Sequence, residues 1–557
     1  MDTHHFSTSD AVSDRLVTYL EAEGVEFVFG IPGEENIWLI RSLKRSSSIR
    51  YILVRHEQAA SFMADIYGRL TGRAGVCSAT LGPGAINLLL GTTDAQTCSA
   101  PLVALAAQVG LNRIYKESHQ SVDLAAMFRP VTKWSDTVLS PAALPEMVRK
   151  AFDLAQCGRP GAVFLAVPED IEQLDGASLA PPLRSAPRFR SLVDDAGLAQ
   201  AAAMIAAASH PILLAGHGVA RSGASDALRR FAEASGLPAA VTFHGKGVIP
   251  DDHANALGTV GFMKHDYENF SFDAADLILA VGYEVQEFDP VKINPKQDKT
   301  VIHLHEFVQD SDKCYQPKLN LIGDIAAALD GLASRLTRRT SLPEAATRAR
   351  RLHDEELAKG AADDSFPLKP ARIVSDIRQA LGDADIVLAD TGAAKMWMAR
   401  LYPTRQPNTC IISNGLSTMA FALPGALAAK LAFPERRVLA SMGDAAFLMN
   451  SQEIETAVRE KIPLAVLIWE DASYGLIKWK MDLELHEHEH VDFTNPDFTA
   501  YAESFGARGV RVTQADQLLP ALREALASDG VTVVTCPVDY ADNVKLTDML
   551  GKLTAAG

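Results

Sequence analysis

Short apolar runs alternate with amphipathic, helix-prone segments along most of this chain, and that alternation restricts the fold more than any other feature. Residues 25–30, 211–216 and 438–443 are three such runs, and each ends at a glycine. A buried strand followed by an amphipathic helix is typical of a parallel sheet covered on both faces. Ligands bind such sheets at the carboxyl ends of the strands. The sequence therefore predicts an α/β fold whose chemistry lies in the segments that follow the strands.

The chain of 557 residues is longer than one hydrophobic core normally supports. Two segments are typical of linkers: residues 180–188 are proline-rich and basic, and residues 338–366 are polar and helix-prone. They divide the chain into residues 1–180, 190–337 and 366–557, each close to the usual size of a domain. We predict three doubly wound parallel-sheet domains, and the sequence leaves open whether the first and third share one fold.

The charge balance limits the partners of the protein. A net charge of −16 disfavours nucleic acid and anionic membranes, because both are bound through basic patches. No uncharged apolar run reaches membrane-spanning length, and residues 1–5 do not begin a signal peptide. The six cysteines have no CxxC spacing, so we expect free thiols. These observations predict a cytoplasmic protein with no nucleic-acid or membrane partner.

The third block carries acidic residues at the ends of two predicted strands. Gly443 permits a close turn, Asp444 follows it, and a helix is expected to begin between residues 447 and 451; Asp471 and Ser473 follow the next apolar run. A helix N-terminus favours a phosphate, and Mg²⁺ is usually shared between one or two carboxylates and phosphate oxygens. The pattern therefore predicts a site for a divalent cation and a diphosphate. A helix cap at Asp444 and a loop start at Asp471 are the alternative interpretation.

This segment resembles the glycine-aspartate-glycine motif of the thiamine diphosphate enzymes, which is followed some two dozen residues later by asparagine or aspartate. The resemblance implies Mg²⁺ ligands at Asp444, Asp471 and the Ser473 carbonyl. It also implies cofactor contacts at Gly443, Ala445, Ala446, Tyr474 and Gly475. Ala445 departs from the motif, which has a second glycine there, and its methyl group is expected to crowd the diphosphate.

The first block resembles the family's glutamate segment at residues 54–60. The resemblance implies that Glu57 hydrogen-bonds the aminopyrimidine ring of the cofactor, which then removes the thiazolium C2 proton. Gly33, Gly82 and Asn87 lie in glycine- and proline-rich turns that allow close approach to a ligand. Taken alone, a glutamate before a helix more often complements the helix dipole.

A third resemblance covers residues 412–419. In the family, an apolar side chain in this segment wedges between the two cofactor rings, and a carbonyl two residues earlier accepts from the 4′-amino group. Met419 and Ser417 hold those positions here. Met419 as a simple core residue is the alternative. The strand-to-helix turn over residues 390–395, which contains Gly392, Ala393 and Ala394, is implied to contact the diphosphate.

Over nearly its whole length the chain is most similar to acetolactate synthases, in particular the catabolic, FAD-independent type. Residues 29–36, 119–133 and 474–480 carry much of this resemblance. It implies that a 2-oxo acid, pyruvate, is decarboxylated on the cofactor and that the remaining two-carbon unit attacks a second pyruvate to give 2-acetolactate. Gln120 is implied to orient the acceptor, and His119 is a candidate for proton transfer, although a surface-loop histidine is an equal alternative.

The middle block departs from the FAD-binding members. Residues 283–290 replace their arginine-rich segment, and Arg221 stands where a dinucleotide fingerprint needs glycine. We therefore expect no FAD and a central domain without its own cofactor. The histidine-rich run at residues 486–490 is interpreted as a solvated loop, with a metal site as the less favoured alternative.

Two other functions stay open at this point. One is a different thiamine diphosphate-dependent decarboxylase or carboligase, which the departures at Glu35, Ala445 and residues 486–490 favour. The other is a non-catalytic member of the fold, which only Ala445 favours. The resemblance also implies a homodimer or homotetramer with active sites at the subunit interface.

Overall fold

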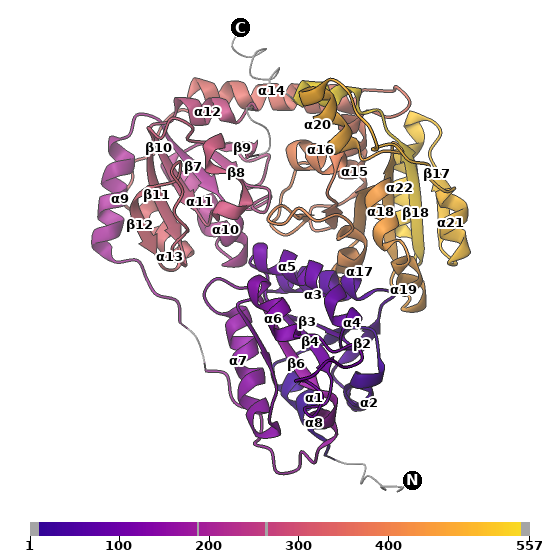
Figure 1. Ribbon diagram of the computed structural model, residues 1–557. Coiled ribbons are helices and arrows are strands. Elements are labelled where there is room, and N and C mark those ends of the chain that lie inside the picture. Colours follow the sequence, from indigo (N-terminus) through magenta and orange to yellow (C-terminus); the bar gives the residue numbers. More distant parts are fainter. Residues whose placement is uncertain (1–9, 187–188, 262–265, 547–557) are drawn as a thin grey trace, which may run out of the picture. The chain divides into compact units, whose positions relative to one another are not determined.

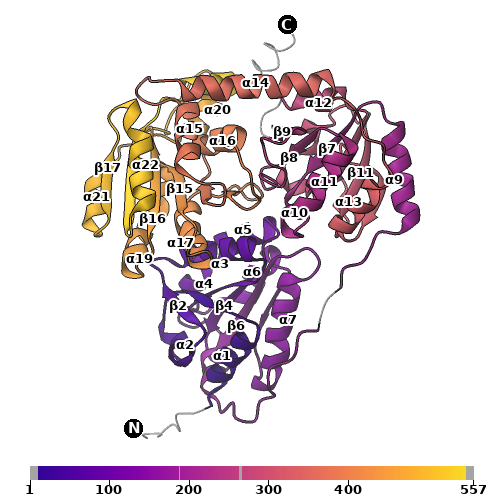
Figure 2. The same ribbon diagram turned by 180° about the vertical axis from the view of Figure 1, so that it is seen from behind.

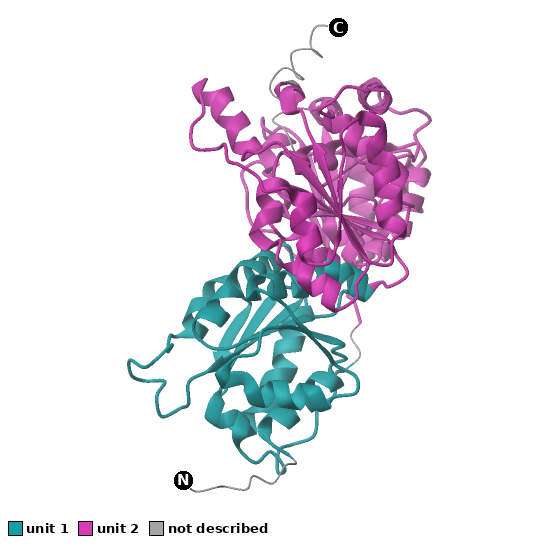
Figure 3. Cartoon of the chain, turned by 90° about the vertical axis from the view of Figure 1, so that its right-hand side faces the viewer, with its two compact units in different colours: residues 1–188, 427–432 teal, residues 189–426, 433–557 magenta. Residues whose placement is uncertain are grey.

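The computed structural model describes residues 10–186, 189–261 and 266–546. Residues 1–5 and the last two residues of the first predicted linker therefore lie outside the described residues. Two compact units are present: one comprises residues 1–188 with 427–432, and the other comprises residues 189–426 with 433–557 (Figure 3). The first unit holds one parallel sheet and the second holds two. Within the described residues each sheet has six strands, and helices flank each of them (Figures 1 and 2).

The first sheet has the strand order β2-β1-β3-β4-β6-β5, and every pairing is parallel. β4 and β6 lie inside the sheet and are buried throughout, because helices cover both faces. The strands are β1 (Phe27–Gly30), β2 (Arg50–Leu53), β3 (Gly75–Ala79), β4 (Leu102–Gln108), β5 (Trp134–Thr137) and β6 (Ala162–Pro168). The helices are α1 (Val12–Ala22), α2 (Ile37–Arg45), α3 (Glu57–Thr71), α4 (Pro83–Asn87), α5 (Leu89–Thr97), α6 (Leu124–Phe128), α7 (Leu144–Gln156) and α8 (Glu169–Gln173).

The central sheet has the order β12-β11-β10-β7-β8-β9, again with parallel pairing. Counted from its own first strand, this is the 3-2-1-4-5-6 order of dinucleotide-binding folds. The strands are β7 (Pro211–Ala215), β8 (Ala239–Val241), β9 (Ala256–Thr259), β10 (Leu277–Val281), β11 (Thr300–His305) and β12 (Pro317–Ile322). The helices are α9 (Asp195–Ala207), α10 (His217–Arg221), α11 (Ser225–Ser235), α12 (Asn269–Ala274) and α13 (Ile325–Ala333).

The third sheet has the order β14-β13-β15-β16-β18-β17 and is also parallel. Numbered from its own first strand it reads 2-1-3-4-6-5, the same order as the first sheet, so these two domains share one topology. The strands are β13 (Ile386–Ala389), β14 (Cys410–Ile412), β15 (Val438–Gly443), β16 (Leu464–Glu470), β17 (Arg508–Arg511) and β18 (Val531–Pro537). The helices are α15 (Pro370–Ala380), α16 (Ala393–Leu401), α17 (Ala422–Ala432), α18 (Asp444–Asn450), α19 (Glu453–Arg459), α20 (Gly475–Leu485), α21 (Phe498–Ser504) and α22 (Leu518–Ala527).

The second predicted linker is largely an ordered helix, α14 (Glu344–Ala361). It packs against α12 of the central domain and α15 of the third (Figures 1 and 2). Ala346 and Ala349 are fully buried in it, and the Arg350 guanidinium donates to the His253 and Ala254 carbonyls at 2.8 Å. The polar, helix-prone sequence thus forms a connecting helix that joins the two domains of the second unit.

Candidate functional site

All predicted site residues of the third domain follow four strands that are neighbours in the sheet, β14-β13-β15-β16. Because these strands are parallel, their carboxyl ends lie at one edge. Gly392 follows β13, Ser417 and Met419 follow β14, Asp444 follows β15, and Asp471 follows β16. The topology therefore brings these predicted residues to a single edge of the sheet.

Asp444 joins two of the loops at that edge. Its side chain is 1% exposed, and its Oδ2 accepts from the Asp471 N–H at 3.1 Å and the Ala472 N–H at 2.7 Å. Its Oδ1 accepts from the Ala445 N–H at 2.8 Å. The predicted helix start between residues 447 and 451 was wrong: α18 begins at Asp444 itself, directly after the strand ends at Gly443, and the Asp444 carboxylate accepts the N–H of Ala445 in the first turn.

Asp471 lies beside Asp444. Burial and the charge of Asp444 raise the pKa of Asp471 to about 7. The Ser473 hydroxyl donates to Asp471 Oδ2 at 3.0 Å. Two neighbouring carboxylates suit a divalent cation that takes its remaining ligands from phosphates and water. Among the residues that the structure describes, no group of three or more His, Cys, Asp or Glu side chains forms a metal site from protein ligands alone.

The surroundings of this pair fit a diphosphate and a cation. A Cβ placed at Gly443 or Gly392 would meet nothing within 4 Å, so open space lies against both turns. Two buried side-chain oxygens, Thr391 Oγ1 and Asn495 Oδ1, have no hydrogen-bond partner among the described residues. A cavity of about 550 Å³ also borders Asp471. A polar ligand would be able to approach the backbone at these open turns and would supply hydrogen bonds to the unsatisfied buried oxygens.

The remaining predicted residues of this domain differ in how far they are exposed. Ala394 and Ala446 are 2% and 1% exposed as whole residues and are therefore buried. Ala393 is also buried, whereas Ala445, Tyr474 and Gly475 are at least partly exposed. Met419 is half-buried, which disfavours its alternative interpretation as a simple core residue.

The first domain gathers its predicted residues at the equivalent edge, after β1, β2, β3 and β4. Glu57 begins α3 and is 9% exposed, and the Asn87 side-chain amide donates to Glu57 Oε2 at 3.0 Å. The absence of a side chain at Gly84 leaves space for Oε1, the other carboxyl oxygen of Glu57, because a Cβ at Gly84 would lie only 3.2 Å from it. Asn87, predicted as a cofactor contact, is thus placed as a partner of Glu57.

Two glycines in this domain pack against protein atoms. A Cβ at Gly33 would lie 2.3 Å from the Thr80 Cβ, and a Cβ at Gly82 would lie 2.8 Å from the Gln120 carbonyl oxygen. Gln120 has a left-handed backbone (φ 56°), and both it and His119 are exposed. The structure therefore places Gln120 beside Gly82, and it gives His119 the surface-loop position of its alternative interpretation.

Sequence reasoning missed Asn495 at the edge of the third sheet, and it gave no individual role to three polar residues of the expected diphosphate turn, Asp390, Thr391 and Lys395. Asn495 donates its amide to Asp444 Oδ2 at 2.8 Å from a loop 51 residues away. Asp390 accepts from the Thr391, Ala420 and Ala422 N–H groups, and burial raises its pKa to about 7. Lys395 and Thr391 flank the Gly392 turn. A polar residue directly after a predicted strand was the available signal for Asp390 and Thr391, whereas contacts over long sequence separations leave no such signal.

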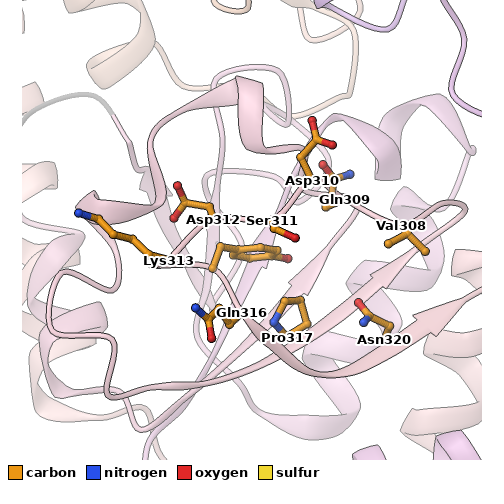
Figure 4. A pocket seen from close by; sticks show the side chains of 10 residues that line it. Val308, Gln309, Asp310, Ser311, Asp312, Lys313, Gln316, Pro317 and Asn320 are labelled. Atoms are coloured by element: carbon orange, nitrogen blue, oxygen red, sulfur yellow. The ribbon is translucent and has the colours of Figure 1, made fainter.

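A cavity in the central domain and the histidine-rich run at residues 486–490 contribute none of the predicted site residues at the edge of the third sheet. A cavity of about 520 Å³ follows β11 in the central domain and carries Asp310, Asp312 and Lys313 (Figure 4). Its lining includes none of the predicted site residues. Residues 486–490 form a mostly exposed loop after α20, as predicted, and His488 Nδ1 lies 2.6 Å from Asp482 Oδ1.

Fold and site geometry together define an α/β protein suited to hold a diphosphate and a divalent cation at the ends of parallel strands. Three models of thiamine pyrophosphate enzymes match the chain: the N-terminal TPP binding domain over residues 10–127, the central domain over 198–332, and the C-terminal TPP binding domain over 390–536.

Curated relatives extend the match to almost the full length. Acetolactate synthase from Bacillus subtilis is 36% identical over 97% of this chain and 95% of its own. The catabolic acetolactate synthase of Raoultella terrigena is 38% identical over 97% of both chains. The large subunit of acetolactate synthase isozyme 2 from Escherichia coli is 34% identical over 95% of this chain and 96% of its own. The chain belongs to the thiamine pyrophosphate enzymes, as an acetolactate synthase-like member, which confirms the predicted resemblance. No helix in the described part of the chain is long and apolar enough to span a membrane.

Proposed function

We propose that the protein is a thiamine diphosphate- and Mg²⁺-dependent carboligase that converts two molecules of pyruvate into 2-acetolactate and carbon dioxide. The single observation that carries the proposal is the Asp444–Asp471 pair, which lies beside open glycine turns on a sheet that matches the C-terminal TPP binding domain. Relatives named acetolactate synthase, which cover nearly the full chain, support this choice of reaction. When bound, the cofactor supplies a nucleophilic carbon that also accepts the electron pair released on decarboxylation.

In the third domain the chain would bind and orient the cofactor. Asp444, Asp471 and the Ser473 carbonyl would hold Mg²⁺, and the backbone at Gly392 and Gly443 would approach the diphosphate. Because Asp444 also receives N–H groups from the Asp471 loop, one carboxylate fixes the separation of the two metal-binding segments. The Ala445 N–H already donates to Asp444, which turns the backbone at that position towards the carboxylate.

In the first domain Glu57 would exchange a proton with the aminopyrimidine ring. The Asn87 amide holds Glu57 Oε2, which fixes the carboxyl group in one orientation. Burial excludes most water from the carboxyl group and strengthens any hydrogen bond that it makes to the cofactor. Gln120, exposed beside Gly82, would contact the acceptor pyruvate.

We further propose that the protein uses no FAD. At the turn after β7, where a dinucleotide phosphate would approach, the buried Glu287 carboxylate accepts from the His217 N–H at 3.2 Å. A Cβ at Gly216 would lie 2.6 Å from Glu287 Oε1, so the protein's own side chain fills that space. The Glu287 carboxyl group therefore already takes the N–H group and the space at this turn that a dinucleotide phosphate would need. Flavin absorbance after acid precipitation of the purified protein tests this statement.

Product analysis tests the reaction. We expect purified protein, supplied with pyruvate, thiamine diphosphate and Mg²⁺, to release one carbon dioxide for each 2-acetolactate, with little free aldehyde. Omission of either cofactor should stop both products. Aldehyde in a one-to-one ratio with carbon dioxide, without acetolactate, would replace the proposal by a 2-oxo acid decarboxylase.

We also propose a homodimer or homotetramer in which Glu57 of one subunit serves the diphosphate site of another. Mixing two variants tests this arrangement at a cofactor concentration too low to restore Asp444→Asn, because Glu57→Gln and Asp444→Asn would then damage opposite halves of each shared site. Random reassembly should restore about a quarter of the wild-type activity, since half of the dimers are mixed and each contains one intact site. No recovery after proven subunit exchange would place both residues in one subunit's site.

A further inference from the structure

The segment between β14 and α17 has an unusual backbone that other residues must hold in place. Ser417 and Ala420 are non-glycine residues with left-handed φ angles of 56° and 71°. Such conformations cost free energy and persist where surrounding contacts impose them. Asp390 and Asn450 secure the Ala420 end, since Asp390 Oδ1 accepts from the Ala420 N–H and the Asn450 amide donates to the Ala420 carbonyl. The contacts at the Ser413 end come from a different set of residues.

Lys395, on the first turn of α16, reaches this segment at three places. Its ammonium group lies 3.4 Å from the Ser413 carbonyl, 3.3 Å from Asn414 Oδ1 and 3.2 Å from Ser417 Oγ. The side chain is 5% exposed. A buried lysine gives up much of its hydration, so the oxygens that accept from it must lie close to it. Lys395 thus joins the helix that follows the Gly392 turn to the segment that carries Ser417 and Met419.

Asn414 continues the connection into the central domain. Its amide donates to the Glu287 carbonyl at 2.5 Å, and its backbone N–H donates to His244 Nε2 at 3.2 Å. Because His244 Nε2 accepts, the imidazole proton resides on Nδ1, which lies 4.0 Å from Glu287 Oε2. Glu287 of the central domain therefore contacts Asn414 directly, and it also lies beside His244, the second central-domain partner of Asn414.

Glu287 is a rigid anchor for this connection. It is fully buried, and its carboxyl group is also bonded to the Thr242 hydroxyl at 2.5 Å and the Glu284 N–H at 3.0 Å. Movement of Asn414 would leave the carbonyl of the buried Glu287 without this partner, which is costly. The central domain consequently offers the segment a fixed reference point instead of a mobile surface.

We propose that Lys395 and Asn414 are positioning residues, through which the central domain, without a cofactor of its own, sets the geometry of the segment that holds the thiamine rings. This inference rests on the proposed function, because it takes residues 413–419 as the ring-binding segment. Neither residue is assigned contact with reacting atoms. Their effect passes through Ser417 and Met419.

A connection that only stabilises the two domains is the competing explanation, and Arg405 supplies the matched control. Its guanidinium binds Asp252 of the central domain at 3.0 Å and Asp383 of the third domain at 2.9 Å. It therefore joins the same two domains, but from an exposed position and without a contact to residues 413–419 among those that the structure describes. Arg405→Gln loosens the domain contact while leaving the ring-binding segment intact.

The test compares Asn414→Ala, Lys395→Met, Lys395→Arg and Arg405→Gln in the full-length protein. Thiamine diphosphate affinity is measured by quenching of tryptophan fluorescence with Mg²⁺ present, the bound cofactor by near-ultraviolet circular dichroism, and folding by thermal unfolding of the cofactor-free protein. We expect Asn414→Ala and Lys395→Met to weaken cofactor binding at least tenfold and to change the dichroism of the bound cofactor. Lys395→Arg should recover part of the affinity, and Arg405→Gln should leave both signals unchanged.

The proposal is overturned if Asn414→Ala and Lys395→Met fold and bind the cofactor with wild-type affinity and dichroism. It is equally overturned if Arg405→Gln reproduces their effects, because domain contact alone would then explain them. If one replacement does not fold, Asn414→Ser and Lys395→Gln, which keep a polar group, provide the same comparison. Wild-type protein that binds no thiamine diphosphate defeats both the proposed function and this inference. Wild-type protein that binds it but yields a different product defeats only the reaction proposed above.

Discussion

The first and third domains have the same strand order but different chemical groups at the same edge. In each, the predicted residues follow the first four strands of the domain. The second strand is followed by Glu57 in the first domain and by the Ser417 segment in the third. The fourth is followed by Gln120 in one and Asp471 in the other. Topology thus determines where a site can form, and the residues at the strand ends determine what it can do.

The two edges also differ in how much of their space the protein fills. Gly33, after the first strand of the first domain, packs against Thr80, whereas Gly392, its counterpart in the third, faces open space. Glu57 has an amide partner, while Asp471 neighbours another carboxylate. Protein atoms therefore fill more of the space at the glycine turn of the first edge, whereas the third edge is arranged so that a cation and an anionic group would complete it.

Replacement of Glu57 by glutamine is expected to have the largest effect on this comparison. Glutamine keeps the size of the side chain and a hydrogen-bonding group but cannot exchange the proton, so turnover should fall by about 10²–10⁴-fold. Cofactor affinity should change little, because the groups proposed to hold the diphosphate and Mg²⁺ lie on the other sheet. Steady-state turnover and calorimetric titration measure the two quantities. Loss of binding with normal residual turnover would contradict the role assigned to Glu57.

Replacement of Asp444 by asparagine should instead weaken cofactor binding more than it lowers turnover at saturating cofactor. The variant loses a charge at the proposed Mg²⁺ site, and we expect apparent affinity for Mg²⁺ and thiamine diphosphate to fall by about 10–100-fold. Saturating cofactor should restore much of the turnover. Asp529→Asn is the control, since Asp529 is exposed elsewhere in the same domain. Equal loss of affinity in both variants would indicate a general charge effect.

The sequence was sufficient to predict the framework of this comparison but not its finer contacts. Residues 438–443 and 464–469 were predicted as buried strands and are β15 and β16, because fully apolar runs leave few other structures. Asp444 and Asp471 were visible because each directly follows such a run. Asn495 was missed, and Lys395 was placed in the diphosphate turn without its actual partners, since these residues reach their partners over separations of 51 and about 20 residues through tertiary structure.

Two glycine-to-alanine substitutions test whether protein atoms fill the space at the edge of the first sheet and whether the edge of the third sheet is open. Gly33→Ala would force a Cβ to within 2.3 Å of Thr80 Cβ, so we expect the cofactor-free protein to lose about 1–3 kcal/mol of stability. Gly443→Ala meets no atom within 4 Å and has an ordinary φ of −71°, so stability should hold while cofactor affinity declines. Urea unfolding and cofactor titration separate the two outcomes. A destabilised Gly443→Ala protein without an affinity change would show that the third edge is not open for a ligand.

The smallest expected effect concerns a buried carboxyl group away from both edges. Glu172, on α8 of the first domain, is 1% exposed and accepts from the Leu39 N–H at 3.1 Å; burial is the main cause that raises its pKa to about 8. Between the ordinary glutamate pKa and pH 8 the folded protein keeps this proton while the unfolded chain releases it. The contribution to stability is therefore complete at low pH and is lost as the pH rises towards 8. Glu172→Gln remains neutral, so its urea midpoint should fall less between pH 5 and 8 than that of the wild type.

Glu146→Gln, exposed on α7, is the matched control and should keep the wild-type slope. An unchanged slope in Glu172→Gln would mean that Glu172 is ionised in the folded first domain.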